Sequence, residues 1–199
     1  MEALRVGQKV PEFEIATYEP SEGVYGKFSL KTVLENKKWV ILVFYPADFT
    51  FVCPTELADL AEKQEELKKL GCEVVSISTD TQHVHLAWQL QEKLLEHVNY
   101  HMGADPTGTV SRIFGVYDEN TGLAFRGTFI VNPDGTLAGT EVNLNNVGRN
   151  ADELVRKVKA FLYVREHPQE VCPAKWKPGD KTLKPGENIV GKVYKALGK

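Results

Sequence analysis

The chain has 199 residues, of which 42% are hydrophobic and 26% are charged. These proportions fit a globular protein with a sizeable core and exclude a disordered or fibrous one. The length leaves little room for two full domains. Lys and Arg number 24 against 27 Asp and Glu, a net charge of -3 with no long block of one sign, which argues against nucleic acid as a partner.

The longest apolar run, Trp39 to Tyr45, is too short to cross a bilayer, and the first five residues lack the apolar stretch of a secretory signal. We therefore expect a cytoplasmic protein without membrane association. The three cysteines, Cys53, Cys72 and Cys172, are too few and too widely spaced for the disulfide framework of a secreted domain. A disulfide in this chain is more readily explained by redox chemistry.

Patterns typical of strands and helices alternate along most of the chain. An N-terminal hairpin is predicted within residues 13–30. The β-branched and aromatic run 39–45 is typical of a strand buried on both faces, and Pro46 ends it. Residues 54–70 place their leucines on one helical stripe, and Gly71 follows as a C-terminal cap.

The next predicted strand covers residues 72–78, and a helix is expected from about residue 83 to residue 98. The periodicity of that helix predicts an inward-facing stripe formed by Leu86, Ala87, Leu90, Leu94 and Val98. This strand and helix complete a β-α-β-α centre.

A second hairpin is expected from residues 125–131 and 136–142, which flank the strong turn sequence Asn-Pro-Asp-Gly. A last helix is predicted from about Asn150, as its N-cap, to Arg165, with Glu153 in the capping-box position.

This element order predicts an α/β protein with a mixed central sheet flanked by helices, the thioredoxin-like arrangement. After residue 167 the chain is rich in proline and glycine and shows little periodicity. We expect residues 1–167 to form the thioredoxin-like domain. Residues 168–199 are expected to be an extended C-terminal tail that gains order on a partner subunit.

Cys53 is the candidate nucleophile because the central strand leads through a short loop directly to it and to the following Pro54. The carboxyl end of a central strand is where α/β proteins usually bind ligands. Proline suits the first turn of a helix, so Cys53 is expected beside the N-cap, where the helix dipole and free N–H groups favour a thiolate. The alternative is a buried structural thiol, the commoner fate of a cysteine in an apolar run.

Two residues of the same loop are candidates for supporting roles. Thr50 offers a hydroxyl that can donate to a bound oxygen and accept from the thiol, and Pro46 can shield the pocket from water. A threonine in such a turn is otherwise more often a cap than a catalytic group.

The loop sequence Pro-Ala-Asp-Phe-Thr-Phe-Val-Cys-Pro-Thr-Glu, residues 46–56, resembles the peroxidatic loop of the peroxiredoxins. Residues 170–176, Glu-Val-Cys-Pro-Ala-Lys-Trp, resemble the resolving-cysteine segment of the typical 2-Cys group. The strand sequence that begins with Arg126 supplies the arginine that this family places beside the reactive sulfur. Within the family, the chain is most similar to the peroxidase subunits of bacterial alkyl hydroperoxide reductases.

The resemblance implies a thiol peroxidase cycle. The Cys53 thiolate would attack a hydroperoxide and become a sulfenic acid, with Arg126 and Thr50 stabilising the developing charge. Glu56 could orient Arg126 by a charge-assisted hydrogen bond, or it could simply be a favourable acid in a first helical turn. Cys172 would then form an intersubunit disulfide with Cys53, which requires local unfolding at both cysteines.

The resemblance also implies partners. A homodimer follows from the tail cysteine, and a ring of five dimers is usual in the family. The reductant could be a flavoprotein disulfide reductase or a thioredoxin. Residues 120–123 and 193–195 lack the motifs of the oxidation-sensitive members, so we expect a tail that releases easily.

The sequence gives little support for cofactor binding, metal binding or a different function. No Gly-rich phosphate loop, Cys-x-x-Cys pair or flavin fingerprint occurs, so no cofactor is expected. Cys72 is expected to pack in the core. The pairs His83/His85 and His97/His101 are expected to be solvated or capping residues and not metal ligands. The competing functions are a thiol-disulfide oxidoreductase, which normally uses Cys-x-x-Cys, and a chaperone or scaffold.

Overall fold

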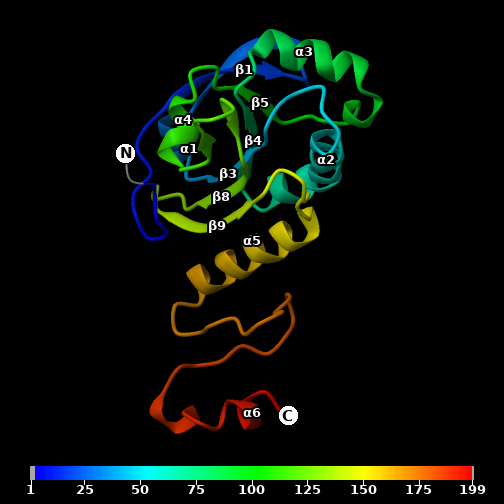
Figure 1. Cartoon of the computed structure of the whole chain (residues 1–199). Coiled ribbons are helices and arrows are strands. Elements are labelled where there is room, and N and C mark those ends of the chain that lie inside the picture. Colours follow the sequence, from blue (N-terminus) through cyan, green and yellow to red (C-terminus); the bar gives the residue numbers. More distant parts are fainter. Residues whose placement is uncertain (1–2, 199) are drawn as a thin grey trace. The chain divides into compact units, whose positions relative to one another are not determined.

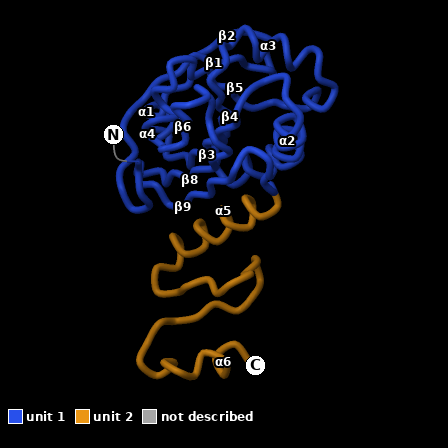
Figure 2. The backbone as a smooth tube through the Cα atoms, viewed as in Figure 1, with its two compact units in different colours: residues 1–151 blue, residues 152–199 orange. Residues whose placement is uncertain are grey.

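The computed structural model describes residues 3–198, which fall into two compact units, one extending to Ala151 and the other starting at Asp152 (Figure 2). The unit boundary therefore lies after the first residue of the last long helix. The domain boundary expected at residue 167 stays a prediction. Within the described residues, no helix combines the length and the apolar character needed to span a membrane.

The first unit is built on a seven-stranded mixed sheet with the order β2-β1-β5-β4-β3-β8-β9 (Figure 1). Strands β3, β4 and β5 run parallel, and the flanking pairs are antiparallel. The strands of this sheet are β1 (Glu14–Glu19), β2 (Val24–Ser29), β3 (Trp39–Phe44), β4 (Cys72–Ser78), β5 (His101–Ala104), β8 (Arg126–Val131) and β9 (Leu137–Asn143). A separate small hairpin joins β6 (Tyr117–Asp118) to β7 (Leu123–Ala124).

Helices cover both faces of this sheet, with α1 and α4 on one side and α2 and α3 on the other (Figure 1). Their bounds are Leu30–Glu35 for α1, Cys53–Lys69 for α2, Gln82–Gln91 for α3 and Thr109–Ile113 for α4. All six residues of β3 are buried, as expected for a strand covered on two faces. The predicted thioredoxin-like fold, a mixed sheet flanked by helices, is confirmed.

Both predicted hairpins are present. β1 pairs with β2 in register from Glu14↔Ser29 to Glu19↔Val24. In the β8–β9 hairpin, Asn132 N–H donates to the Thr136 carbonyl at 2.9 Å, and Gly135 takes a φ of 83° that suits glycine. The turn sequence thus sets the register of the strand that begins at Arg126.

The helix predicted over residues 83–98 is wrong in its end and in its buried face. α3 ends at Gln91, and a separate 3-10 turn, η1, spans Lys93–Leu95. The break occurs because Glu92 adopts an extended conformation and its carboxylate accepts from Leu94 N–H at 3.1 Å. Leu90 is 73% exposed.

The inward face of α3 is formed by His85 and Trp88. Hydropathy favours leucine over histidine at a core position, whereas His85 is buried because both its ring nitrogens have partners. The pattern also missed β5 and α4, which have four and five residues, too short for a periodicity to show.

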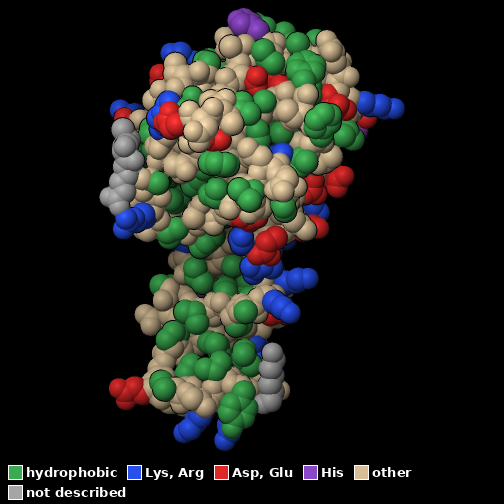
Figure 3. Space-filling view, in the orientation of Figure 1, with side chains coloured by type: hydrophobic (Ala, Val, Ile, Leu, Met, Phe, Trp, Pro, Cys, Tyr) green, Lys and Arg blue, Asp and Glu red, His purple; other side chains and the backbone are tan. Residues whose placement is uncertain are grey.

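The second unit contains most of helix α5 (Ala151–Glu166), whose bounds lie within one residue of the prediction, and the tail that follows it. The tail holds a backbone bridge between Val171 and Leu183 and two short helices, η2 (Glu187–Ile189) and α6 (Val193–Ala196). On the face shown in Figure 3, hydrophobic side chains of this unit lie open among Lys and Arg side chains.

Candidate active site

Cys53 is the first residue of the 17-residue helix α2, directly after the loop that leaves β3. Val52 is the N-cap and Pro54 occupies the second helical position, one place later than expected, because the helix begins at Cys53. The missing N–H of proline is not needed there. The side chain of Cys53 is fully buried and lies at the N-terminus of α2, which is the positive end of the helix dipole.

Arg126 is the charged group next to the sulfur. It is the first residue of β8, whose Gly127 pairs with Phe44 at the end of β3, so the sheet register delivers it to the loop. Arg126 Nη1 lies 3.4 Å from Cys53 Sγ. Its side chain is 3% exposed. Burial opposes its charge, but the hydrogen bond to Cys53 and the nearby Glu56 outweigh burial and raise the pKa of Arg126.

The guanidinium of Arg126 is held on two sides. Nη1 donates to Glu56 Oε2 at 2.6 Å, while Nε and Nη2 both donate to the backbone carbonyl of Asn145, at 2.9 and 2.8 Å. All three guanidinium nitrogens are thereby fixed in direction, and Nη1 faces the sulfur as well as the carboxylate. Of the two alternatives for Glu56, a contact with Arg126 or only a favourable acid in the first turn, the structure shows the contact.

Arg149 is a member of this cluster that the sequence did not reveal. It donates to Glu56 Oε1 through its backbone N–H and its Nε, both at 2.8 Å, and through Nη2 to Oε2 at 3.0 Å. Burial raises the pKa of Glu56, but the hydrogen bonds from Arg149 outweigh burial and the net shift is downward. One buried carboxylate thus binds two guanidinium groups, which leaves net positive charge beside the thiol.

No local signal marks Arg149, because it lies in the irregular stretch between β9 and α5. Gly148, just before it, comes close to α2: a β-carbon there would meet Val52 Cγ1 at 3.3 Å. The small residue allows the stretch to approach Glu56. A glycine-arginine pair before a predicted helix is too common a feature to identify such a contact from sequence.

Thr50 and Pro46 lie in the loop between β3 and α2. Pro46 is buried and Thr50 is partly exposed. The Thr50 hydroxyl donates to the Ala47 carbonyl at 2.8 Å, which closes the turn before Cys53. Because the hydroxyl proton of Thr50 is already donated to Ala47, the hydroxyl oxygen can still accept a hydrogen bond. The hydroxyl must rotate before it can donate to a bound oxygen.

A buried polar network anchors the start of this loop. Tyr45 OH donates to Asp48 Oδ1 at 2.7 Å, and His85 Nδ1 lies 2.7 Å from Asp48 Oδ2. His85 Nε2 lies 3.0 Å from the Gly103 carbonyl. The expectation that His85 is solvated or capping is wrong, because its side chain is fully buried. Burial raises the pKa of Asp48.

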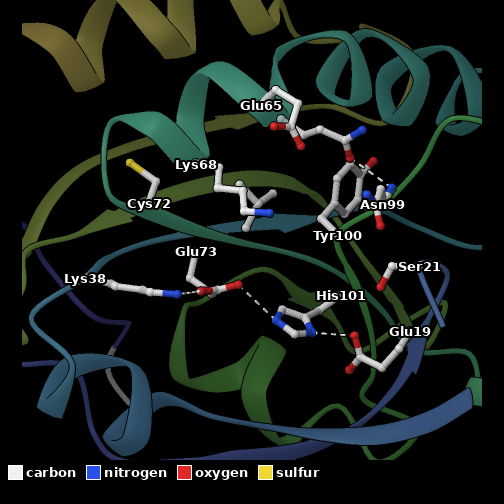
Figure 4. Close-up of a pocket in the computed structure, with 12 residues that line it drawn as sticks. Glu19, Ser21, Lys38, Glu65, Lys68, Cys72, Glu73, Asn99, Tyr100 and His101 are labelled. Carbon is white, nitrogen blue, oxygen red and sulfur yellow. Dashed lines mark hydrogen bonds and ion pairs between the residues drawn. The ribbon is translucent and has the colours of Figure 1, made fainter.

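A polar cleft of about 260 Å³ lies at the other end of the parallel strands (Figure 4). Four of the residues that line it pair with one another in a chain. Lys38 Nζ lies 2.6 Å from Glu73, which lies 3.1 Å from His101 Nε2, and His101 Nδ1 lies 2.6 Å from Glu19. His101 is therefore an ion-pair centre, and the prediction that it is solvated or capping is wrong.

Cys72 lies in the wall of this cleft as the first residue of β4 and is 5% exposed. Burial, with the charge of Glu73, raises the pKa of the Cys72 thiol to about 12. It is thus a protonated, buried thiol, in line with the sequence interpretation. In residues 3–198, no group of three or more His, Cys, Asp or Glu side chains is arranged to hold a metal.

Cys172 lies in the second unit and is half-buried, with its thiol 3.9 Å from the Ala160 carbonyl on α5. Burial raises the pKa of this thiol; Arg156 opposes that shift and Glu170 adds to it. Its pairing with Cys53 stays a prediction.

Comparison with known proteins defines the class. The model of the AhpC/TSA family matches residues 6–140, and that of the C-terminal domain of 1-Cys peroxiredoxin matches residues 160–194. The first match spans the buried thiol with its arginine, and the second spans Cys172. The chain therefore belongs to the AhpC/TSA family, and it is a peroxiredoxin, a thiol-dependent peroxidase.

Its relatives narrow this class further. The chain is 56% identical over 188 residues to alkyl hydroperoxide reductase C of Amphibacillus xylanus, covering 94% of this chain and 98% of the relative. The counterpart from Staphylococcus aureus is 45% identical over the same shares.

Solved structures agree. AhpC of Enterococcus faecalis is 45% identical with a TM-score of 0.79, over 84% of this chain and 98% of that one. The reduced 2-Cys peroxiredoxin of Plasmodium vivax has a TM-score of 0.87 at 28% identity, over 92% and 94% of the two chains. The protein is thus a 2-Cys peroxiredoxin of the AhpC type.

Proposed function

We propose that the chain reduces hydrogen peroxide and organic hydroperoxides, with Cys53 as the attacking thiolate. The observation that carries this proposal is the 3.4 Å contact between Arg126 Nη1 and Cys53 Sγ at a buried helix N-terminus. The sulfur attacks one peroxide oxygen, an S–O bond forms as the O–O bond breaks, and Cys53 becomes a sulfenic acid. The leaving oxygen takes a proton from solvent and departs as water or an alcohol.

The neighbouring residues support this step in different ways. Arg126 stabilises the thiolate and the charge that develops on the oxygens. Glu56 is a positioning residue, because it holds Arg126 and Arg149 at hydrogen-bond distance. Thr50 accepts from the incoming peroxide or donates to it after rotation, and Pro46 limits water access to the loop.

The second half of the proposed cycle uses Cys172. Its thiolate attacks the sulfenic sulfur of Cys53, the S–O bond breaks, and hydroxide leaves as the disulfide forms. The 2-Cys relatives support Cys172 as the resolving cysteine, supplied by the other subunit of a homodimer. The exposed apolar side chains of the tail, including Val171, Val190 and Tyr194, support an ordered position on a partner.

Reducing equivalents then come from a dithiol reductant, either a flavoprotein disulfide reductase or a thioredoxin, so the chain itself uses no cofactor in this cycle. A ring of five dimers is the assembly we propose, and the cytoplasm, which keeps such thiols reduced, is the proposed location. The role is antioxidant defence and redox homeostasis.

The test is stopped-flow oxidation of the pre-reduced protein by hydrogen peroxide, followed by non-reducing gel electrophoresis. We expect fast peroxide consumption that Cys53→Ser abolishes and that Cys172→Ser limits to one turnover. A disulfide-linked dimer should form in wild type and in the matched control Cys72→Ser. Consumption that continues in Cys53→Ser would overturn the proposal.

A further inference from the structure

The tail segment that carries Cys172 is closed at its base by two backbone hydrogen bonds. Val171 N–H donates to the Leu183 carbonyl at 2.9 Å, and Leu183 N–H donates to the Val171 carbonyl at 3.1 Å. The residues between them form a loop, and Cys172 is its first residue. Moving Cys172 by more than a side-chain rotation therefore opens this base.

Glu170 connects the same base to helix α5. Its Oε2 accepts from Tyr163 OH at 2.7 Å and also from the Thr182 hydroxyl, while Lys184 Nζ lies 3.9 Å from Oε1. Tyr163 belongs to α5, and Thr182 lies on the returning side of the loop. One carboxylate thus joins the helix to both strands of the loop base.

The inside of the loop is filled by Trp176, which is 2% exposed. Its ring centroid lies 4.9 Å from that of Tyr163, and its carbonyl accepts from Arg156 Nη1 at 3.0 Å. Tyr163 therefore contacts both Glu170 and Trp176. This one tyrosine thus makes both an aromatic contact and a charge-assisted hydrogen bond.

Cys172 is restrained in this arrangement. Its sulfur faces the Ala160 carbonyl at 3.9 Å, and burial together with the Glu170 charge raises the pKa of the thiol. Disulfide formation needs a thiolate that is free to approach along the S–O bond. Release of the loop base supplies both the freedom and the contact with water.

We propose that Tyr163, Glu170 and Thr182 form a latch that holds Cys172, and that the opening of this latch sets the rate at which Cys172 forms its disulfide. The inference deepens the proposed function, because it rests on Cys172 being the resolving thiol. Tyr163 and Thr182 act through Glu170 and are positioning residues. We refer to these three residues as the Glu170 latch.

Two variants each remove one hydroxyl and leave the charge of Glu170 in place. Tyr163→Phe keeps the ring beside Trp176, and Thr182→Val keeps the side-chain shape. These hydrogen bonds are partly exposed, so the loss of one of them should match the net value of an ordinary protein hydrogen bond and make the opening equilibrium about three- to tenfold larger. Glu187→Gln, a change at an exposed tail acid, is the matched control.

The first readout is independent of the peroxidase reaction. Reduced protein with Cys53→Ser is treated with a neutral alkylating agent, and Cys172 labelling is followed by mass spectrometry across pH. Labelling should be about three- to tenfold faster in both latch variants and unchanged in the control. Glu170→Gln should also move the pH midpoint downward, because it removes the charge that raises the pKa of Cys172. Wild-type labelling rates in both latch variants would refute the latch.

The second readout is the two-phase reaction with peroxide. In the latch variants the peroxide-independent phase, disulfide formation, should accelerate by the same factor. The peroxide-dependent phase should not change, and the overoxidised fraction should fall. Faster labelling together with a disulfide that does not need Cys172 would support the latch and overturn the proposed function. Normal labelling together with a Cys172-dependent disulfide would overturn the latch alone.

Discussion

The ion chain of Lys38, Glu73, His101 and Glu19 makes a specific prediction about stability and pH. These residues belong to, or directly flank, β3, β4, β5 and β1, which are neighbours in the sheet. The chain of charges therefore crosses four neighbouring strands at one end of the sheet. Burial alone would lower the pKa of His101. The hydrogen bonds to Glu19 and Glu73 outweigh burial, so the pKa of His101 is raised from 6.5 to about 9.

A raised pKa means that the folded state binds the His101 proton more tightly than the unfolded state does. The stabilisation is therefore complete below about pH 6.5 and disappears as the pH passes 9. With 1.36 kcal/mol for each pKa unit, the contribution near pH 7 is about 2 to 3 kcal/mol. The lowered pKa of Glu73, about 2, reflects partly the same contacts, so the two contributions do not add.

The experiment is urea denaturation of wild type and His101→Gln at fixed protein concentration between pH 6 and pH 10. We expect the free-energy gap between the two proteins to shrink by about 3 kcal/mol over this range. His97→Gln is the control, because the His97 side chain is 84% exposed. The difference in unfolding free energy between this variant and wild type should stay near zero. A gap for His101→Gln that does not vary with pH would refute the reasoning.

Three further substitutions test the first unit. Arg126→Lys should slow peroxide oxidation of Cys53 about 10²- to 10³-fold, because a hydrogen-bond donor directed at the reacting atoms is lost. Stopped-flow rates within twofold of wild type would contradict this. Arg112→Lys is the surface control. Asp48→Asn replaces one of the two carboxylate oxygens that Tyr45 and His85 contact in the buried network and should lower the free energy of unfolding by about 1 to 3 kcal/mol, so a loss below about 0.5 kcal/mol in urea melts would count against the network. Cys72→Ala should leave the oxidation rate unchanged and cost about 1 kcal/mol of stability; a large loss of peroxidase activity would show that its thiol takes part.

The sequence predicted the structure well where a pattern of a few neighbouring residues determines it. The apolar run of β3, the turn at Gly135 and the Cys53-Pro54 step each act over a few residues, and each appears at or within one residue of its predicted place. Arg126 was identified from resemblance to a family pattern and Glu56 from its place in the first helical turn, and the structure places the two in contact.

The missed features depend on contacts far apart in the chain. Arg149 meets Glu56 across 93 residues, and no spacing rule links them. His85 is buried because Asp48 and the Gly103 carbonyl satisfy its ring, so its polarity misleads a hydropathy pattern. Burial of a polar side chain is decided by its partners, and partners are known only after the chain has folded.

The carbonyl of Asn145 that accepts two hydrogen bonds from Arg126 has a consequence for evolution. A backbone oxygen is supplied by any amino acid, so the direction of the guanidinium is encoded by the path of the chain after β9. The amide oxygen of the Asn145 side chain is itself buried without a hydrogen-bond partner. Another residue at position 145 could therefore supply the same backbone oxygen, and an alanine substitution there would leave the contact with Arg126 in place.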